Sequence, residues 1–131
     1  MIRPLLSVLI FFTQLFNPGL FQGDIVDSLS TLFKAGNSKE ISKNFSPSVE
    51  LTINEEEDVY TKAQAEQIVR EFFTKNAPVN STVVHLINTN PNYRFGILSL
   101  STKNGKFRVA ITLKKTANTF FITELRIEPD K

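Results

Sequence analysis

Residues 93–127 alternate apolar and polar side chains, and this pattern restricts the chain to a fold that contains an antiparallel sheet. The middle of this segment places large apolar residues at every second position: Phe107, Val109, Ile111 and Leu113. Successive side chains of a strand point to opposite faces, so this run has one apolar face. The dipeptide Asn104-Gly105 precedes it and favours a type I′ hairpin turn, because both central residues of that turn need positive φ. The pattern therefore predicts a hairpin.

The turn residues fix the expected register of this hairpin. With Asn104-Gly105 at the turn, Lys103 lies opposite Lys106, and the register continues with Leu100 opposite Val109, Leu98 opposite Ile111 and Gly96 opposite Leu113. A second turn near residues 115–118 returns a third strand along the hairpin. By parity, this third strand adds to the same apolar face Phe121, Thr123, Leu125 and Ile127.

Upstream of this segment, the apolar spacing predicts two amphipathic helices and a shorter one between them. Residues 24–35 carry an i, i+3, i+4, i+7 stripe that ends at Gly36-Asn37, and a short helix begins at Ser38 and closes before Pro47. The longest helix spans 61–75, where Thr61 and Gln64 have the spacing of a capping box. Strands are expected at 49–53, 59–60 and 81–88, with an acidic turn at 54–58.

This order of elements predicts one α+β domain over residues 24–131. The helices are expected to cover one face of an antiparallel sheet, because an apolar sheet face must be buried against another layer. This layering resembles the cystatin-like and nuclear transport factor 2-like folds, and that resemblance implies a curved sheet that wraps around the N-terminal helices and the long helix as a cone.

Residues 1–23 have the pattern of a secretory signal peptide. A short basic head is followed by an apolar run from Leu5 to Phe16, which is too short to span a bilayer, and then by Asn17-Pro18-Gly19. Cleavage is expected between Gly19 and Asp24. The protein is therefore predicted to be exported, either periplasmic or secreted, with no membrane anchor after removal of the leader. The chain has no cysteine, so no disulfide can stabilise it.

Composition argues against several classes of function. The net charge is only +2, which is too small to indicate a nucleic-acid-binding surface. One histidine and an acidic run at residues 55–58 do not reproduce the spacing of a metal site. The sequence contains no glycine-rich phosphate loop. We therefore expect no metal, no cofactor and no nucleic-acid partner.

Four segments resemble a small secreted family of the Bacteroidetes type whose function is unknown. They are Gly23-Asp24-Ile25, the run from Val59 to Ala65, the run from Asn104 to Val109, and Glu124-Leu125-Arg126-Ile127. The order of elements also resembles the nuclear transport factor 2-like superfamily. That resemblance implies a cone with an internal pocket, and in some members an acid–base residue within it.

The apolar face of the predicted sheet and the long helix supply the residues expected to line this pocket. They are Leu98, Leu100, Val109, Ile111 and Leu125 of the sheet and Phe72 of the helix. Since these side chains cannot transfer protons, we predict no catalytic residue. The alternative is a small isomerase-like or dehydratase-like enzyme using His85 with Tyr60 or Asp58. On the outer face, parity groups Phe95, Ile97, Phe120 and Ile122 as an apolar patch, which we interpret as a homodimer interface.

The sequence thus favours an exported, non-enzymatic module that binds a small apolar ligand or a protein partner, and that is homodimeric. The isomerase-like enzyme is the second hypothesis. A cystatin-like protease inhibitor would share the layering of helices on a sheet, but the sequence shows no inhibitory loop.

Overall fold

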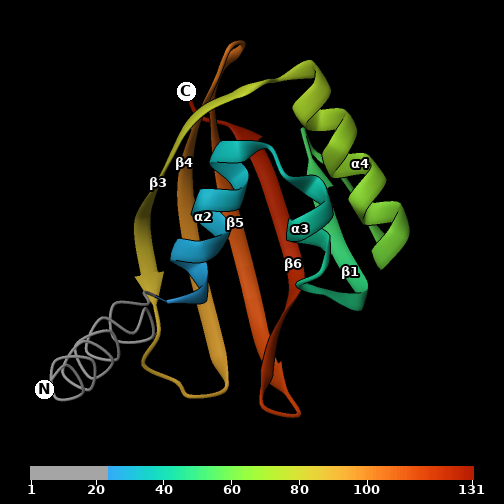
Figure 1. Cartoon of the computed structure of the whole chain (residues 1–131), viewed down its shortest axis with the longest axis vertical. Helices are drawn as coiled ribbons and strands as arrows, with labels where there is room; N and C mark the ends of the chain where they lie inside the picture. Colours follow the sequence, from blue (N-terminus) through green and yellow to red (C-terminus); the bar gives the residue numbers. More distant parts are fainter. Residues whose placement is uncertain (1–23) are drawn as a thin grey trace, which may run out of the picture.

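The described residues, 24–131, form three helices on one side of a six-stranded, curved sheet in this computed structural model (Figure 1). The helices are α2 (Ile25–Ala35), α3 (Ser38–Ser42) and α4 (Lys62–Lys75). The strands are β1 (Phe45–Ile53), β2 (Glu56–Thr61), β3 (Pro78–Ile87), β4 (Tyr93–Thr102), β5 (Gly105–Thr116) and β6 (Thr119–Pro129). The predicted leader, residues 1–23, lies outside the described part of the chain.

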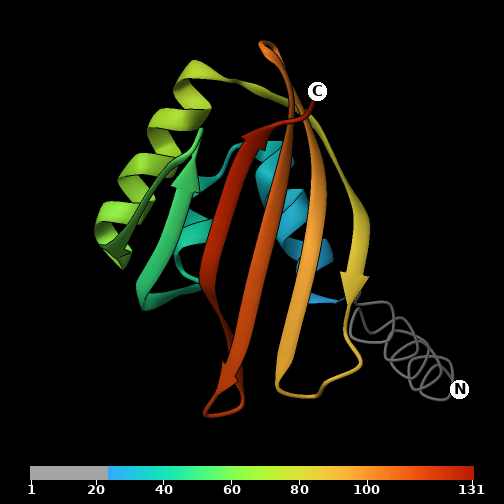
Figure 2. The ribbon, with the colours of Figure 1, turned by 180° about the vertical axis from the view of Figure 1, so that it is seen from behind.

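The strand order is β2-β1-β6-β5-β4-β3, so β2 and β3 form the two edges of the sheet. Neighbouring strands are antiparallel except β1 and β6, which pair in parallel. We call the side of the sheet that faces the helices the inner face and the other side the outer face. Within residues 24–131 no helix covers the outer face (Figure 2). The predicted α+β architecture is confirmed.

Both longer helices begin with the reciprocal hydrogen bonds of a capping box. Thr61 Oγ1 accepts from the backbone N–H of Gln64 at 3.2 Å, and the Gln64 side chain accepts from the Thr61 N–H at 3.0 Å. Asp24 and Asp27 make the equivalent pair at the start of α2. These bonds satisfy backbone N–H groups that a helix start leaves unpaired. The predicted starts of both helices are confirmed.

The first strand begins earlier than the sequence pattern indicates. It was expected over 49–53, but β1 starts at Phe45 and contains Pro47. Proline is tolerated there because the β1–β6 register shifts between Phe45 and Glu50, so the missing N–H breaks no regular ladder.

The hairpin between β4 and β5 forms, but its predicted register is wrong by two residues. Thr102 pairs with Gly105, and Leu98 pairs with Val109. Gly105 has a positive φ of 120°. Asn104 is not among the residues with positive φ, so the turn is not of type I′. Thr102 Oγ1 accepts from the Asn104 N–H at 3.1 Å, which gives the backbone an alternative to the I′ geometry. A two-residue shift keeps each side chain on its expected face.

A β-bulge in β6 changes which side chains point inward. Thr112 pairs with Glu124 but Leu113 pairs with Ile122, so Thr123 is the extra residue. Because of this extra residue, the side chains that precede Thr123 point to the face opposite the predicted one. Phe120 and Ile122 therefore lie on the inner face, and their predicted place on the outer face is wrong. Ile122 is fully buried in the core, and Phe120 packs against that core.

Phenylalanine fills much of the space between the helices and the sheet. Phe33 of α2 meets Phe73 of α4 edge-on at 5.7 Å between ring centroids, and Phe72 meets Phe107 of β5 at 4.9 Å. Such edge-to-face pairs add to the free energy gained from burial. At the other end of α2, Val26 packs directly on Gly96 of β4. The core is therefore closed by contacts that are distant in sequence.

Candidate functional site

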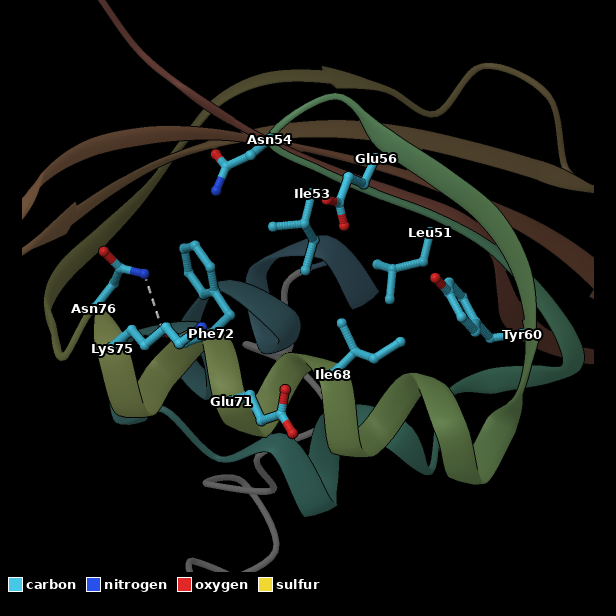
Figure 3. A pocket seen from close by; sticks show the side chains of 10 residues that line it. All are labelled: Leu51, Ile53, Asn54, Glu56, Tyr60, Ile68, Glu71, Phe72, Lys75 and Asn76. Carbon is cyan, nitrogen blue, oxygen red and sulfur yellow. Dashed lines mark hydrogen bonds between the residues drawn. The ribbon is translucent and has the colours of Figure 1, made fainter.

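A groove of about 290 Å³ lies between α4 and the β1–β2 hairpin (Figure 3). The hairpin contributes Leu51, Ile53 and Tyr60 to its wall, and α4 contributes Ile68 and Phe72. Figure 3 shows the hairpin side chains pointing toward those of the helix. Since Ile53, Tyr60 and Ile68 remain only partly buried, the groove offers an apolar surface to a ligand.

Polar residues form the rim of this groove. They are Asn54, Glu56, Glu71, Lys75 and Asn76. Two carboxylates and one ammonium group therefore border the apolar wall. The Asn76 side chain donates to the Phe72 carbonyl at 3.1 Å, which holds this residue at the end of α4. The lining thus combines five apolar or aromatic residues with five polar ones, which makes it more polar than the predominantly apolar lining of most small-molecule sites.

A tight turn positions the hairpin over α4. Asn54 and Glu55 have φ values of 52° and 75°, as the central residues of a type I′ turn require, and Ile53 pairs with Glu56. The Asn54 N–H also donates to the Ile127 carbonyl at 3.1 Å. The hairpin is thereby fixed to β6. The sequence pattern predicts an acidic turn over residues 54–58, whereas the turn itself is Asn54-Glu55 and β2 begins at Glu56; asparagine is a residue type that tolerates positive φ.

The residues predicted to line a pocket lie elsewhere, with one exception. Phe72 lines the groove, whereas the other five are fully buried in the core: Leu98, Leu100, Val109, Ile111 and Leu125. The helices occupy the space that these side chains face. The mouth of the groove is instead formed by the first hairpin.

The three residues of the enzyme alternative do not form one site. Tyr60 lines the groove. Asp58 is exposed on the same strand, and its carboxylate accepts from the N–H of Val59 at 2.8 Å. His85 pairs with Ile97 and shares its outer-face hollow with Phe95 and Arg108. The sheet therefore separates His85 from Tyr60.

Only two of the four residues predicted for the interface lie on the outer face. Phe95 is half-buried, and Ile97 is only 7% exposed. Phe120 is on the inner side, where its ring lies 4.7 Å from the guanidinium carbon of Arg94. The predicted patch is thus smaller than expected and is displaced toward β3 and β4.

Arg94 has a structural role that the sequence analysis did not find. Its Nε donates to Asp24 Oδ2 at 2.8 Å, and the two side chains are only 19% and 11% exposed. Asp24 also accepts from the Val26 N–H, so this ion pair ties the start of α2 to β4. No local pattern indicates a contact across 70 residues.

Two further classes of feature are absent from residues 24–131. No cluster of three or more His, Cys, Asp or Glu side chains is placed to hold a metal ion. Among the helices of this segment, none has the length and apolar character needed to cross a membrane.

Comparison with known proteins places the chain near structures without an assigned activity. Residues 26–128 match DUF4783, a domain of unknown function. A DUF4783 protein from Bacteroides ovatus is 35% identical and superimposes with a TM-score of 0.75, covering 79% of this chain and 93% of that one. One from Bacteroides uniformis is 29% identical with a TM-score of 0.78, covering 82% and 99%. No curated protein matches.

More distant structures support the fold alone. A Nostoc punctiforme domain described as having a cystatin-like fold superimposes with a TM-score of 0.62 at 10% identity, covering 78% of this chain and 70% of that one. Two structures whose printed names carry the abbreviation for nuclear transport factor 2 superimpose with TM-scores of 0.61 and 0.63 at 12% and 14% identity. The predicted resemblance in fold to nuclear transport factor 2-like proteins is confirmed.

Proposed function

We propose that this protein, which belongs to the DUF4783 family, is an exported, non-enzymatic, homodimeric module that binds a small, partly apolar ligand. The groove between α4 and the β1–β2 hairpin carries the proposal, because it combines a partly exposed apolar wall with a polar rim. Export rests on the leader pattern of residues 1–23.

The groove favours a ligand of modest size. Its volume, about 290 Å³, lies just below the range of about 300–1,000 Å³ typical of small-molecule pockets. The apolar part of the ligand would contact Ile53 and Ile68, and its polar groups would reach Glu71 or Lys75 at the rim. Such a ligand gains free energy from burial on one side and hydrogen bonds on the other.

The placement of His85 favours binding over catalysis. A general base must lie within hydrogen-bonding reach of the proton it removes. His85 is exposed on the outer face, so it cannot reach a ligand beside Tyr60. An isomerase-like mechanism that pairs these two residues therefore has no geometric support.

Native mass spectrometry of the mature protein purified from its own host tests this proposal. We expect a dimer that retains a small molecule. Ile68→Arg should lose that mass, because its charged side chain enters the groove from α4. Gln67→Arg is the matched control, since Gln67 is the exposed neighbour outside the groove. Thermal unfolding should confirm that both variants fold.

Two results would contradict the ligand proposal. One is a wild-type protein that carries no additional mass, which would redirect the search toward a protein partner. The other is an Ile68→Arg variant that retains the same mass as the wild type, which would place the molecule outside the groove.

A further inference from the structure

The edge strand β3 exposes an unusual amount of apolar surface. Val59, Val79, Val84 and Ile87 are the exposed large hydrophobic side chains of the described chain, and all but Val59 belong to β3. Val79 is 57% exposed and Val84 is 60% exposed. Both are the extra residues of β-bulges, since the β3–β4 register shifts at each of them. Between these bulges, residues 80–83 form a regular run at the edge of the sheet.

This edge also lacks the charges that usually protect an edge strand. From residue 76 to residue 93 the chain has no Asp, Glu, Lys or Arg, although charged residues make up 21% of the sequence. The opposite edge strand, β2, contains Glu56, Glu57 and Asp58, all exposed. Charged side chains discourage strand pairing between molecules. The chain therefore places charges on one edge strand and none on the other.

We propose that β3 pairs antiparallel with β3 of a second copy, so that two six-stranded sheets join into one. This inference rests on the homodimer of the proposed function and assigns its interface. A strand that pairs with itself about a twofold axis brings like residues together, so charges near the axis would repel. A strand with no charged residue and with three valines meets that requirement, whereas the acidic strand β2 does not.

The charges of α2 fit the same arrangement. Ser30 of α2 contacts Ser81 of β3 through their hydroxyl oxygens at 2.8 Å, which identifies the side of the helix beside this edge. Asp27 and Lys34 lie one turn to either side of Ser30, so they share that side, and both are exposed.

The direction of α2 determines how these charges meet. The helix runs opposite to β3 (Figure 1), and the Cβ position of Gly36 at its end lies 3.4 Å from Pro78 at the start of the strand. In an antiparallel dimer, the end of α2 that carries Asp27 would therefore face the end that carries Lys34 in the second copy. The two opposite charges favour this orientation.

Sedimentation velocity of the mature protein and three lysine variants tests the interface. Val79→Lys should raise the dimer dissociation constant at least tenfold. Val59→Lys, at a side chain of equal exposure on β2, should leave the dissociation constant unchanged. Phe95→Lys probes the outer face and should also have little effect. If the dimer survives Val79→Lys but dissociates with Phe95→Lys, the β3 interface is refuted and the homodimer stands. A monomeric wild type would refute both the β3 interface and the homodimer.

Disulfide trapping then locates the twofold axis. The chain has no cysteine, so single cysteines at residues 80–83 report only on contact between copies. Directly opposed antiparallel residues have Cα atoms about 4.5–5.5 Å apart, within the range for a disulfide. One of the four positions should give a covalent dimer under mild oxidation, and Val59→Cys should not. Equal trapping at Val59→Cys and at all four positions would show random collision and refute the pairing.

Discussion

Gly96 is the point at which α2 approaches the sheet most closely, and replacing it should destabilise the fold. A Cβ atom added there would lie 2.5 Å from Cγ1 and 2.9 Å from Cγ2 of Val26. Carbon atoms in contact normally lie about 3.5–4.0 Å apart. Valine is stiff at χ1 and cannot rotate freely away. Gly96→Ala must therefore displace α2 from β4.

The expected cost follows from overpacking of a dense core. Inserting a methyl group into such a core costs about 1–3 kcal/mol. We expect Gly96→Ala to lower the free energy of unfolding by this amount, measured by urea denaturation followed by circular dichroism. The melting temperature should fall by roughly 4–8 °C for each kcal/mol lost, the scale for domains of about this size.

A double-mutant cycle separates this clash from other effects. Val26→Ala alone should cost about 1.5–3 kcal/mol, because its buried side chain is lost. In the Val26→Ala background, Gly96→Ala should cost much less, since the obstructing methyl groups are gone. Gly105→Ala is the control: Gly105 has open space but a φ of 120°, so its cost should not depend on Val26. Additive effects of Val26→Ala and Gly96→Ala would refute the reasoning.

Three more predictions concern the stability of single contacts, each checked by urea denaturation. Arg94→Ala should lower the free energy of unfolding by about 1.5–3 kcal/mol, because it leaves the partly buried Asp24 carboxylate without its charged donor. The double variant with Asp24→Asn should lose less than the sum of the two single losses, and an additive loss would exclude coupling between Arg94 and Asp24. Thr61→Ala should cost about 1 kcal/mol by removing the cap of α4, and an unchanged midpoint would show that the cap is dispensable. Ile122→Asp should abolish folding, because it buries a carboxylate in the core, whereas the Phe95→Asp variant should stay folded. A folded Ile122→Asp variant and an unfolded Phe95→Asp variant would instead place Ile122 on the outer face.

Local sequence signals predicted the helices well because they depend on neighbouring residues. The Thr61 capping box and the Gly36 helix end involve groups a few positions apart, and both are present. Strand alternation likewise identified the buried side chains of β5. These features do not depend on which distant segment completes the core.

Features that depend on distant partners could not be obtained in the same way. The bulge at Thr123 lies in a strand that pairs with both β5 and β1, and its extra residue reverses the faces to which Phe120 and Ile122 point. The Asp24–Arg94 ion pair depends on the placement of α2 at β4. The alternation of side chains along a single strand predicts neither the bulge nor the ion pair.

The turns show how side-chain hydrogen bonds can override a dipeptide preference. Asn104-Gly105 was expected to supply two residues with positive φ, but only Gly105 does so. Type I′ dihedrals occur instead at Asn54-Glu55 and at Ala117-Asn118, where the φ values are 51° and 66° for the latter pair. Pairing of the flanking strands selects the turn type there, because the primed turns match the twist of a hairpin.

The groove and the open edge lie at opposite ends of the sheet, and this separation bears on how the module could work. The groove belongs to β1, β2 and α4, whereas β3 is the last strand at the other end, with β6, β5 and β4 between them. Pairing through β3 would therefore leave both grooves uncovered, at the two outer ends of a continuous sheet. A ligand in one groove would touch no residue of the other copy. Because no ligand contact would span the two copies, we expect two independent sites, and equal affinities for the first and second ligand would show it. Dimerisation would then serve to cover an uncharged edge and to present two grooves, without altering the affinity of either.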